Sequence, residues 1–318
     1  MQEVAFLRQN AEKWEQFEAL LHRRSSADPD RLAELFVEVT DDLSYAKTFF
    51  PESKTTRYLN GLAAEVHQAI YRNRKEDRGR LIRFWKYELP REVGRARREM
   101  LLALVLFLTS AGVGALSAAN DPGFARLILG DAYVNMTLDN IAKGDPMAVY
   151  KQMAELDMFL AITVNNVWVA FKVFAMGLLT SFGTAYLLFQ NGVMLGAFHA
   201  LFFDRGLLLE SLLVVYIHGA LEISAIIIAG GAGFVMGNGL LFPGTYSRRV
   251  SFMRGARRGL KIVIGLVPIF VAAGFLEGFV TRHTEMPPAL GVSIIGASFA
   301  FIVWYFGIYP LRVERRGP

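Results

Sequence analysis

Long stretches of apolar residues with almost no charge constrain this chain more than any other feature. Residues 100–119 contain no charged side chain, and residues 158–203 contain one, Lys172. A helix of about 20 apolar residues crosses the hydrocarbon core of a bilayer, so each stretch is long enough to span at least once. By contrast, residues 1–99 hold 36 charged side chains. The sequence therefore predicts an all-α, polytopic helical membrane protein preceded by a soluble region.

The first 78 residues carry three amphipathic helical patterns. Apolar residues recur at helical spacing over residues 3–24, 32–46 and 59–71, and proline-containing breaks separate the patterns. We expect a small cytosolic helical bundle over residues 1–78, with its aromatic side chains packed in the core. Those side chains are Trp14, Phe17, Phe36, Phe49, Phe50 and Tyr58.

Residues 79–99 form a basic, amphipathic segment directly before the first apolar stretch. Apolar residues, Trp85 among them, alternate there with Arg and Lys. A helix of this kind lies in the headgroup plane of a membrane, and a plain cytosolic stalk is the alternative. We expect Pro90 to mark the bend into the membrane.

Six membrane segments are expected within a membrane domain over residues 100–311. They cover residues 100–119, 165–190, 192–203, 207–230, 262–279 and 288–310. Residues 192–203 are short for a crossing, so this third segment either crosses at a tilt or forms half of a re-entrant hairpin.

Clusters of Lys and Arg predict the orientation of these segments. Five basic residues lie between Lys86 and Arg98, six lie between Arg248 and Lys261, and more lie in the tail at 312–318. The positive-inside rule places such clusters in the cytoplasm. Both termini are therefore expected inside, and the acidic segment 120–157 outside. The net charge of +5 is explained by these clusters, so we expect no nucleic acid as a partner.

Two ionisable residues stand out within the fourth apolar segment. His218 and Glu222 are four residues apart and share one helix face. Ionisable side chains at this depth face a partner helix or an aqueous cavity. Four interpretations stay open, which are a hydrogen-bonded structural clamp, a transport or proton pathway, contact with a partner's membrane helix, and a metal-protease site. Lys172 is predicted to pair with Glu222, and Glu277 and Glu210 are the alternative partners.

The metal-protease interpretation has little support in the sequence. Zinc hydrolysis needs three protein ligands and a base. The chain has no cysteine, and only His199 is placed to join His218. We therefore expect no catalytic residue, no metal and no cofactor.

Asparagine and glycine residues mark the remaining candidate positions. Asn165 and Asn166 open the second segment and Asn191 closes it, as helix-end residues do. Small-residue faces let helices pack closely, and adjacent glycines also favour a helix break. These faces make a homo-oligomer plausible. The glycines are Gly192, Gly196, Gly230, Gly231, Gly233 and Gly237.

The order of these motifs resembles the stage II sporulation protein M family, also known as DUF95. The resemblance covers about residues 95–312, and the N-terminal region is similar to that of the longer, non-sporulation members. Ile217 and Ser224 depart from the family pattern. The motifs are Asn165-Asn166, Asn191-Gly192 with Leu195-Gly196, His218-Gly219 with Glu222, and the run Ala229-Gly230-Gly231-Ala232-Gly233.

The resemblance implies a function through partners. The founding member of the family acts with peptidoglycan-degrading proteins as a scaffold, and the partners carry the hydrolytic chemistry. We therefore expect a non-enzymatic scaffold or assembly partner for cell-envelope factors in the cytoplasmic membrane of a prokaryote. The lipid bilayer and membrane or envelope proteins are its expected partners. The alternative is a permease-like or channel subunit with a polar pathway around His218, Glu222 and Lys172.

Overall fold

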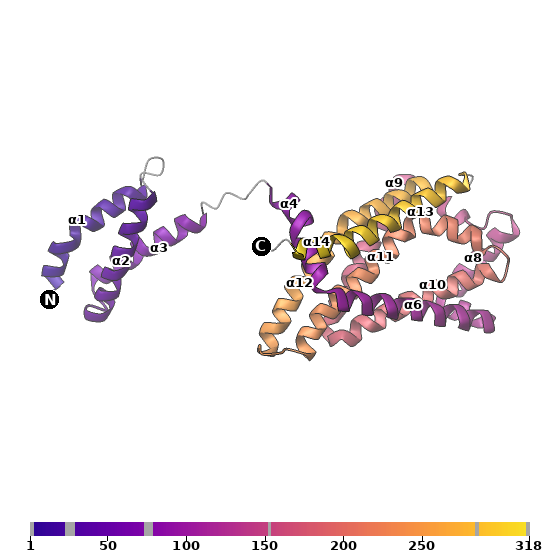
Figure 1. Cartoon of the computed structure of the whole chain (residues 1–318), viewed down its shortest axis with the longest axis horizontal. Helices are drawn as coiled ribbons and strands as arrows, with labels where there is room; N and C mark the ends of the chain where they lie inside the picture. The colour runs from indigo at the N-terminus through magenta and orange to yellow at the C-terminus, as the bar shows by residue number, and fades with distance from the viewer. Residues whose placement is uncertain (1–2, 23–28, 73–78, 152–153, 284–285, 316–318) are drawn as a thin grey trace. The chain divides into compact units, whose positions relative to one another are not determined.

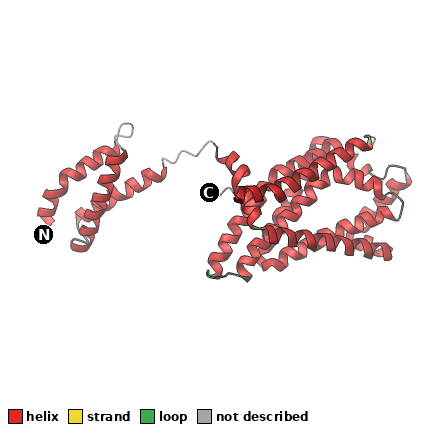
Figure 2. Cartoon of the chain, in the orientation of Figure 1, coloured by secondary structure: helices red, strands yellow, loops and turns green. Residues whose placement is uncertain are grey.

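The computed structural model describes residues 3–22, 29–72, 79–151, 154–283 and 286–315. Within these ranges every regular element is a helix, which confirms the all-α prediction (Figure 2). The chain divides into two compact units, Met1–Arg80 and Leu81–Pro318.

The N-terminal unit is a bundle of three helices, α1 (Glu3–His22), α2 (Pro29–Phe49) and α3 (Lys54–Arg72). Trp14 and Phe17 are buried in its core, and the Trp14 indole N–H donates to Asp42 Oδ2 at 2.8 Å. Phe49 departs from the core prediction and is 59% exposed, because it is the last residue of α2 and stacks outside on Tyr45. The predicted break at residues 25–29 falls almost entirely outside the described residues.

A short helical segment leads into the membrane unit. It consists of α4 (Arg80–Arg83), a π-helical turn η1 (Phe84–Glu88) and α5 (Leu89–Arg95). Leu89 is fully buried, and the Trp85 indole donates to the Gly265 carbonyl at 3.2 Å. This segment therefore packs against α12, a later helix of the same unit.

The bend into the first span lies at Ala96 rather than at Pro90. Ala96 leaves the helical conformation at φ −104° and ψ 19°, and the next helix starts at Arg97. Pro90 instead occupies the first turn of α5, where a missing backbone N–H leaves no hydrogen bond unmade.

Five segments are long and apolar enough to cross a membrane. The first is α6 (Arg97–Asn120), and the second, Glu155–Phe203, consists of α9 (Glu155–Ala175), the 3₁₀ turn η3 (Met176–Leu179) and α10 (Thr180–Phe203). The third is α11 (Leu208–Leu241), and the fourth is α12 (Arg248–Phe275), which a π-helical turn η4 (Leu276–Thr281) continues. The fifth begins with α13 (Pro288–Ile302) and continues through η5 (Val303–Ile308) into α14 (Tyr309–Arg315).

The second of these segments is a hairpin of two helices. Thr180 has a φ of 66°, and across the turn the Thr184 hydroxyl donates to the Val173 carbonyl at 3.0 Å. The helices α9 and α10 have 21 and 24 residues, and each is long enough to cross about 30 Å of hydrocarbon. The described chain thus has six membrane-length helices, the predicted number.

The predicted boundary between the second and third segments is wrong. The helix predicted over residues 165–190 ends at Ala175, and Gly192 lies inside the continuous helix α10. The third segment is therefore a full-length helix of 24 residues, neither a short tilted span nor half of a re-entrant hairpin.

Helix α11 lies at the centre of the membrane unit. Every residue from Ala225 to Gly237 is buried, and α6, α9, α10, α12 and α13 all contact this helix. Figure 1 shows α13 running along one side of the unit, where Gly291 and Ser298 are its buried residues. Long apolar helices with many small residues pack closely in this way.

The acidic segment between the first and second spans is folded. It forms α7 (Pro122–Leu129), α8 (Asp131–Ala142) and a 3₁₀ turn η2 (Ala148–Lys151). Several of its carboxylates have partners within the chain, as Asp131 pairs with Arg126 and Asp145 with Lys151, each at 2.9 Å. We call residues 120–157 the cap.

Candidate functional site

A cavity of about 390 Å³ lies under the cap, within the membrane unit. Its wall comes from α6, α9, α10 and α11, and residues of α7, α8 and η2 complete it. Five of the polar residues singled out in the sequence line this one cavity. They are Asn165, Asn166, Asn191, His218 and Glu222.

His218 is held by contacts to the turn at the end of α12. The side chain is 5% exposed, and its Nδ1 lies 3.1 Å from the Thr281 hydroxyl oxygen. Its Nε2 lies 3.6 Å from Glu277 Oε2. Both partners belong to η4, and π-helical turns of this kind often mark functional positions in helices.

A cluster of one imidazole and two carboxylates results. The ligand atoms offered by His218, Glu222 and Glu277 all lie within 4.8 Å of one another. Residues four apart on a helix share a face, which brings His218 and Glu222 together, and η4 adds Glu277 from a neighbouring element. We call these three residues the His–Glu cluster.

Tyr150 of the cap closes over the His–Glu cluster. Its ring meets the His218 ring edge-on, with centroids 5.6 Å apart. Burial raises the pKa of the Tyr150 hydroxyl well above its ordinary value, and the charges of Glu277 and Glu222 add to the shift. The hydroxyl therefore keeps its proton and can donate a hydrogen bond toward the cavity.

Asn166 is buried beside this cluster. The residue is 5% exposed, and its side-chain Nδ2 makes no hydrogen bond of good geometry to a described residue. Its Oδ1 accepts from Asn165 Nδ2 at 3.3 Å. A buried amide nitrogen without a well-formed hydrogen bond is unusual in a folded protein and points to a group that is bound there.

The sequence suggested that the asparagines cap helices, and this prediction is wrong. Asn165 and Asn166 lie in the middle of α9. Asn191 lies within α10, where its Nδ2 donates to the Leu187 carbonyl at 2.8 Å. All three asparagines line the cavity.

The predicted contact between Lys172 and Glu222 is absent. Lys172 is exposed and has no ion pair among the residues that the structure describes. Because α9 ends at Ala175, Lys172 lies in its last turn rather than at mid-membrane, and its side chain can extend toward the membrane surface. Any pathway through this cavity therefore does not include Lys172.

Two glycines of α10 allow close packing against α6. A Cβ placed on Gly192 would lie 2.7 Å from the Phe107 carbonyl oxygen, and one placed on Gly196 would overlap the Ala111 carbonyl. The run in α11 has the same role, because α11 is continuous and has no break there. Gly230 packs on Leu188, Gly231 on Met100, Gly233 on Thr184 and Gly237 on Ser181.

The contacts of Gly233 and Gly237 bring α10 and α11 together in the part of α11 that lies beyond its cavity-lining residues. They also use the glycine faces within one chain, which removes the argument for oligomerisation that the sequence offered.

His199, the second histidine considered as a zinc ligand, does not join the cluster. Its ring stacks on Tyr216 with centroids 5.7 Å apart. Neither of its ring nitrogens has a hydrogen-bond partner in the described part of the chain. The third ionisable side chain of the His–Glu cluster is instead Glu277.

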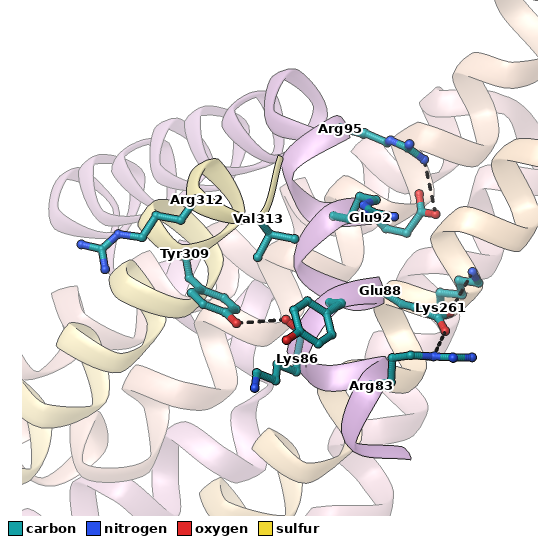
Figure 3. A pocket seen from close by; sticks show the side chains of 11 residues that line it. Arg83, Lys86, Glu88, Glu92, Arg95, Lys261, Tyr309, Arg312 and Val313 are labelled. Carbon is teal, nitrogen blue, oxygen red and sulfur yellow. Dashed lines mark hydrogen bonds and ion pairs between the residues drawn. The ribbon is translucent and has the colours of Figure 1, made fainter. Parts of the chain in front are cut away.

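A second hollow, of about 770 Å³, lies at the opposite end of the membrane unit. Figure 3 shows Arg83, Lys86, Arg95, Lys261 and Arg312 around it, with the helix α5 at its centre. Two carboxylates of this segment are paired, Glu88 of η1 with Lys261 at 3.2 Å and Glu92 of α5 with Arg258 at 2.9 Å. We call this end of the unit the basic end.

Sequence reasoning missed three residues of the site. Glu277 was visible only as a single carboxylate inside an apolar stretch, and Thr281 follows it by one helical turn. Tyr150 lies in the cap, where nothing in the local pattern indicates that the chain returns to the membrane helices. Only the lone carboxylate was a usable signal.

Two family models match parts of the chain, one in each unit. A family model described as Stage II sporulation protein M matches residues 103–282, which include the cavity and the His–Glu cluster. A second model, described as Domain of unknown function (DUF8413), matches residues 4–72 in the N-terminal bundle. No curated protein and no solved structure matches the chain.

Proposed function

Because the chain belongs to the stage II sporulation protein M family, we propose that it is a non-enzymatic assembly partner for cell-envelope proteins. It is a multi-pass membrane protein with a separate helical unit before its spans. The role proposed for the founding member, which works through partners, is the starting point for this assignment.

The observation that carries the proposal is the independent N-terminal bundle. It has its own apolar core and is a compact unit apart from the membrane unit. Its surface exposes large apolar side chains beside charged ones, with Val4 at 61%, Val37 at 60% and Phe49 at 59%. Exposed apolar residues rimmed by polar ones are typical of protein-binding surfaces.

The basic end supports the expected orientation. The basic residues around the second hollow lie next to aromatic residues such as Trp85, Trp304 and Tyr309. Aromatic and basic side chains gather at the cytoplasmic interface of membrane proteins. We infer that the basic end, the N-terminal bundle and the C-terminus face the cytoplasm of a prokaryote, and that the cap faces outward.

Site-directed photo-crosslinking in native membranes tests the scaffold role. A photoreactive amino acid at Phe49 should capture specific envelope proteins, whereas one at Thr48, a polar neighbour on the same helix, should not. His218→Ala, a change within the membrane cavity, should leave this capture intact. If no position on the bundle or the cap yields a specific partner, the scaffold role is wrong.

A second function is favoured by the cavity itself. A polar cavity with ionisable residues inside a membrane unit is the usual arrangement of a solute or proton pathway. The contacts of Gly233 and Gly237 hold α10 and α11 together beyond the cavity-lining residues, so transport requires the two helices to separate there. The pathway alternative therefore predicts a second conformation.

Proteoliposomes separate the two functions. A permease-like protein should move protons or small solutes across the vesicle membrane, and His218→Ala or Glu222→Gln should abolish that flux. A scaffold should show no flux above empty vesicles. If the protein is a scaffold, partner capture at Phe49 should persist in both variants.

A further inference from the structure

The His–Glu cluster places negative charge where the chain offers little to balance it. Its two carboxylates lie with His218 in the membrane unit, and no Lys or Arg is among the described residues that line the cavity. Taking one carboxylate out of water costs several kcal/mol unless it is paired. A bound cation would balance charge on these carboxylates, which the lining of the cavity does not.

In one of its two tautomers, His218 leaves a ring nitrogen available to such a partner. When Nδ1 carries the proton, it donates to the Thr281 hydroxyl oxygen, 3.1 Å away. Nε2 is then an acceptor that faces another acceptor, Glu277 Oε2, at 3.6 Å. Histidines that bind metals almost always donate their other ring N–H to a neighbouring group in this way.

Asn166 provides a second, independent indication of a bound group. Its buried Nδ2 makes no hydrogen bond of good geometry to a described residue, although the Asn166 amide is close enough to interact with the Glu222 carboxylate. An amide N–H there can donate to a metal-bound carboxylate or to a metal-bound water. Without such a group, the amide N–H donates no well-formed hydrogen bond, at a cost of about 1–3 kcal/mol.

We propose that His218 Nε2, Glu222 and Glu277 bind one divalent first-row transition-metal cation, such as Zn²⁺ or Mn²⁺, whose remaining coordination positions face the cavity. Imidazole nitrogen with carboxylate oxygen is a ligand set that these cations accept. Zinc lies about 2.0–2.2 Å from such ligands, so two ligand atoms of a tetrahedral site are about 3.4 Å apart. Ligand atoms separated by up to 4.8 Å would move about 1–1.5 Å closer together when the metal binds.

This site reverses the expectation of no metal that the sequence supported. The sequence offered only His199 as a companion ligand, and the structure replaces it with Glu277 from η4. The proposal is independent of the scaffold and pathway roles, because metal binding is measured directly and requires neither partner capture nor flux.

Metal content of the purified full-length protein tests the proposal. Protein stripped with a chelator is incubated separately with Zn²⁺, Mn²⁺ and Mg²⁺, desalted, and measured by elemental analysis. We expect about one Zn²⁺ or Mn²⁺ per chain and no retained Mg²⁺, which prefers all-oxygen sites. X-ray absorption of the zinc form should show one imidazole nitrogen together with oxygen ligands.

Matched variants locate the site. Glu277→Gln and His218→Gln should weaken Zn²⁺ binding at least about 100-fold, since each removes a ligand, and Thr281→Val about 10-fold, since it removes a supporting contact. His199→Gln is the control, because it changes a half-buried histidine of α10 outside the cluster and should leave binding unchanged.

Two results would overturn the proposal. One is wild-type protein that retains far less than one equivalent of either cation. The other is Glu277→Gln that binds Zn²⁺ as tightly as the wild type. Should His218→Gln fold poorly, the wild-type stoichiometry and the nearly isosteric Glu277→Gln decide the question by themselves.

Discussion

The edge of the Tyr150 ring meets the ring of His218, with an angle of 63° between the ring planes. Tyr150 belongs to η2 in the cap, and His218 lies in the central helix α11. A segment outside the spans is therefore in direct contact with a buried ionisable residue of the membrane unit. This contact makes the cap the ceiling of the cavity.

Replacing Tyr150 should open that ceiling. The chain has no cysteine, so Asn191→Cys places a single thiol in the cavity wall. An aromatic pair adds about 0.5–1.5 kcal/mol, so Tyr150→Ala should raise the rate of thiol modification by a small polar reagent roughly 2- to 10-fold. Tyr150→Phe keeps the ring and serves as the control. Equal rates in both variants would show that Tyr150 does not close the cavity.

Tyr58 should make the N-terminal bundle sensitive to alkaline pH. Burial, followed by the hydrogen bond that its hydroxyl donates to Glu18 Oε2 at 2.8 Å, raises its pKa to about 12. The stability that this raised pKa contributes is fully present below the unfolded value of about 10 and is lost as pH rises toward 12.

Absorbance titration at alkaline pH checks this prediction. The difference between wild type and Tyr58→Phe isolates one tyrosine that ionises near pH 12, and Glu18→Gln should move that midpoint toward 10. If Glu18→Gln leaves the ionisation midpoint of Tyr58 unchanged, the hydrogen bond to Glu18 does not contribute to the raised pKa.

The ion pair between Glu92 and Arg258 should fasten α5 to α12. Glu92 is buried, and its Oε2 accepts from Arg258 Nε at 2.9 Å. Glu92→Gln should lower the free energy of unfolding by about 1–3 kcal/mol, the worth of a hydrogen bond to a charged group. Thermal unfolding in detergent, followed by size-exclusion chromatography, measures the change.

The control for the effect of burial is the neighbouring ion pair, which Glu88 of η1 forms. Glu88 and Lys261 lie 3.2 Å apart with side chains 36% and 45% exposed, so Glu88→Gln should cost less than about 1 kcal/mol. If Glu88→Gln lowers the free energy of unfolding more than Glu92→Gln does, burial does not decide which of the two ion pairs stabilises the protein more.

Gly196 should tolerate no larger residue. A Cβ there would overlap the Ala111 carbonyl of α6, so Gly196→Ala forces the two helices apart and should cost about 1–3 kcal/mol. Gly112 has open space around its Cβ position, and Gly112→Ala should be neutral or stabilise α6 by up to about 1 kcal/mol. The same thermal assay compares them, and similar losses in both would argue against close packing at Gly196.

The number of membrane helices could be predicted from the sequence, whereas the turn between the second and third could not. Apolar length sets the number, because each crossing needs about 20 apolar residues. The turn at residues 176–180 reads Met-Gly-Leu-Leu-Thr, which carries no charge or proline. Asn191-Gly192 is a stronger turn signal, yet it lies inside α10, where Asn191 bonds to the helix backbone.

The polar residues of the cavity were predictable because charged and amide groups are costly in a membrane. That argument identified His218 and Glu222, and the same shift of the turn explains the error at Lys172. A residue expected at mid-membrane lies in the last turn of α9. Glu277, Thr281 and Tyr150 depend on packing between distant elements, which spacing along one helix does not reveal.

The ceiling formed by the cap also orders events during synthesis. Tyr150 leaves the ribosome before His218, and Glu277 and Thr281 follow later still. The ceiling is thus made before the helix that it covers, and at about 5–20 residues per second the interval lasts several seconds. Throughout that interval the cavity lacks the wall formed by α11, so any cation or ligand that it encloses can enter from that side during biogenesis.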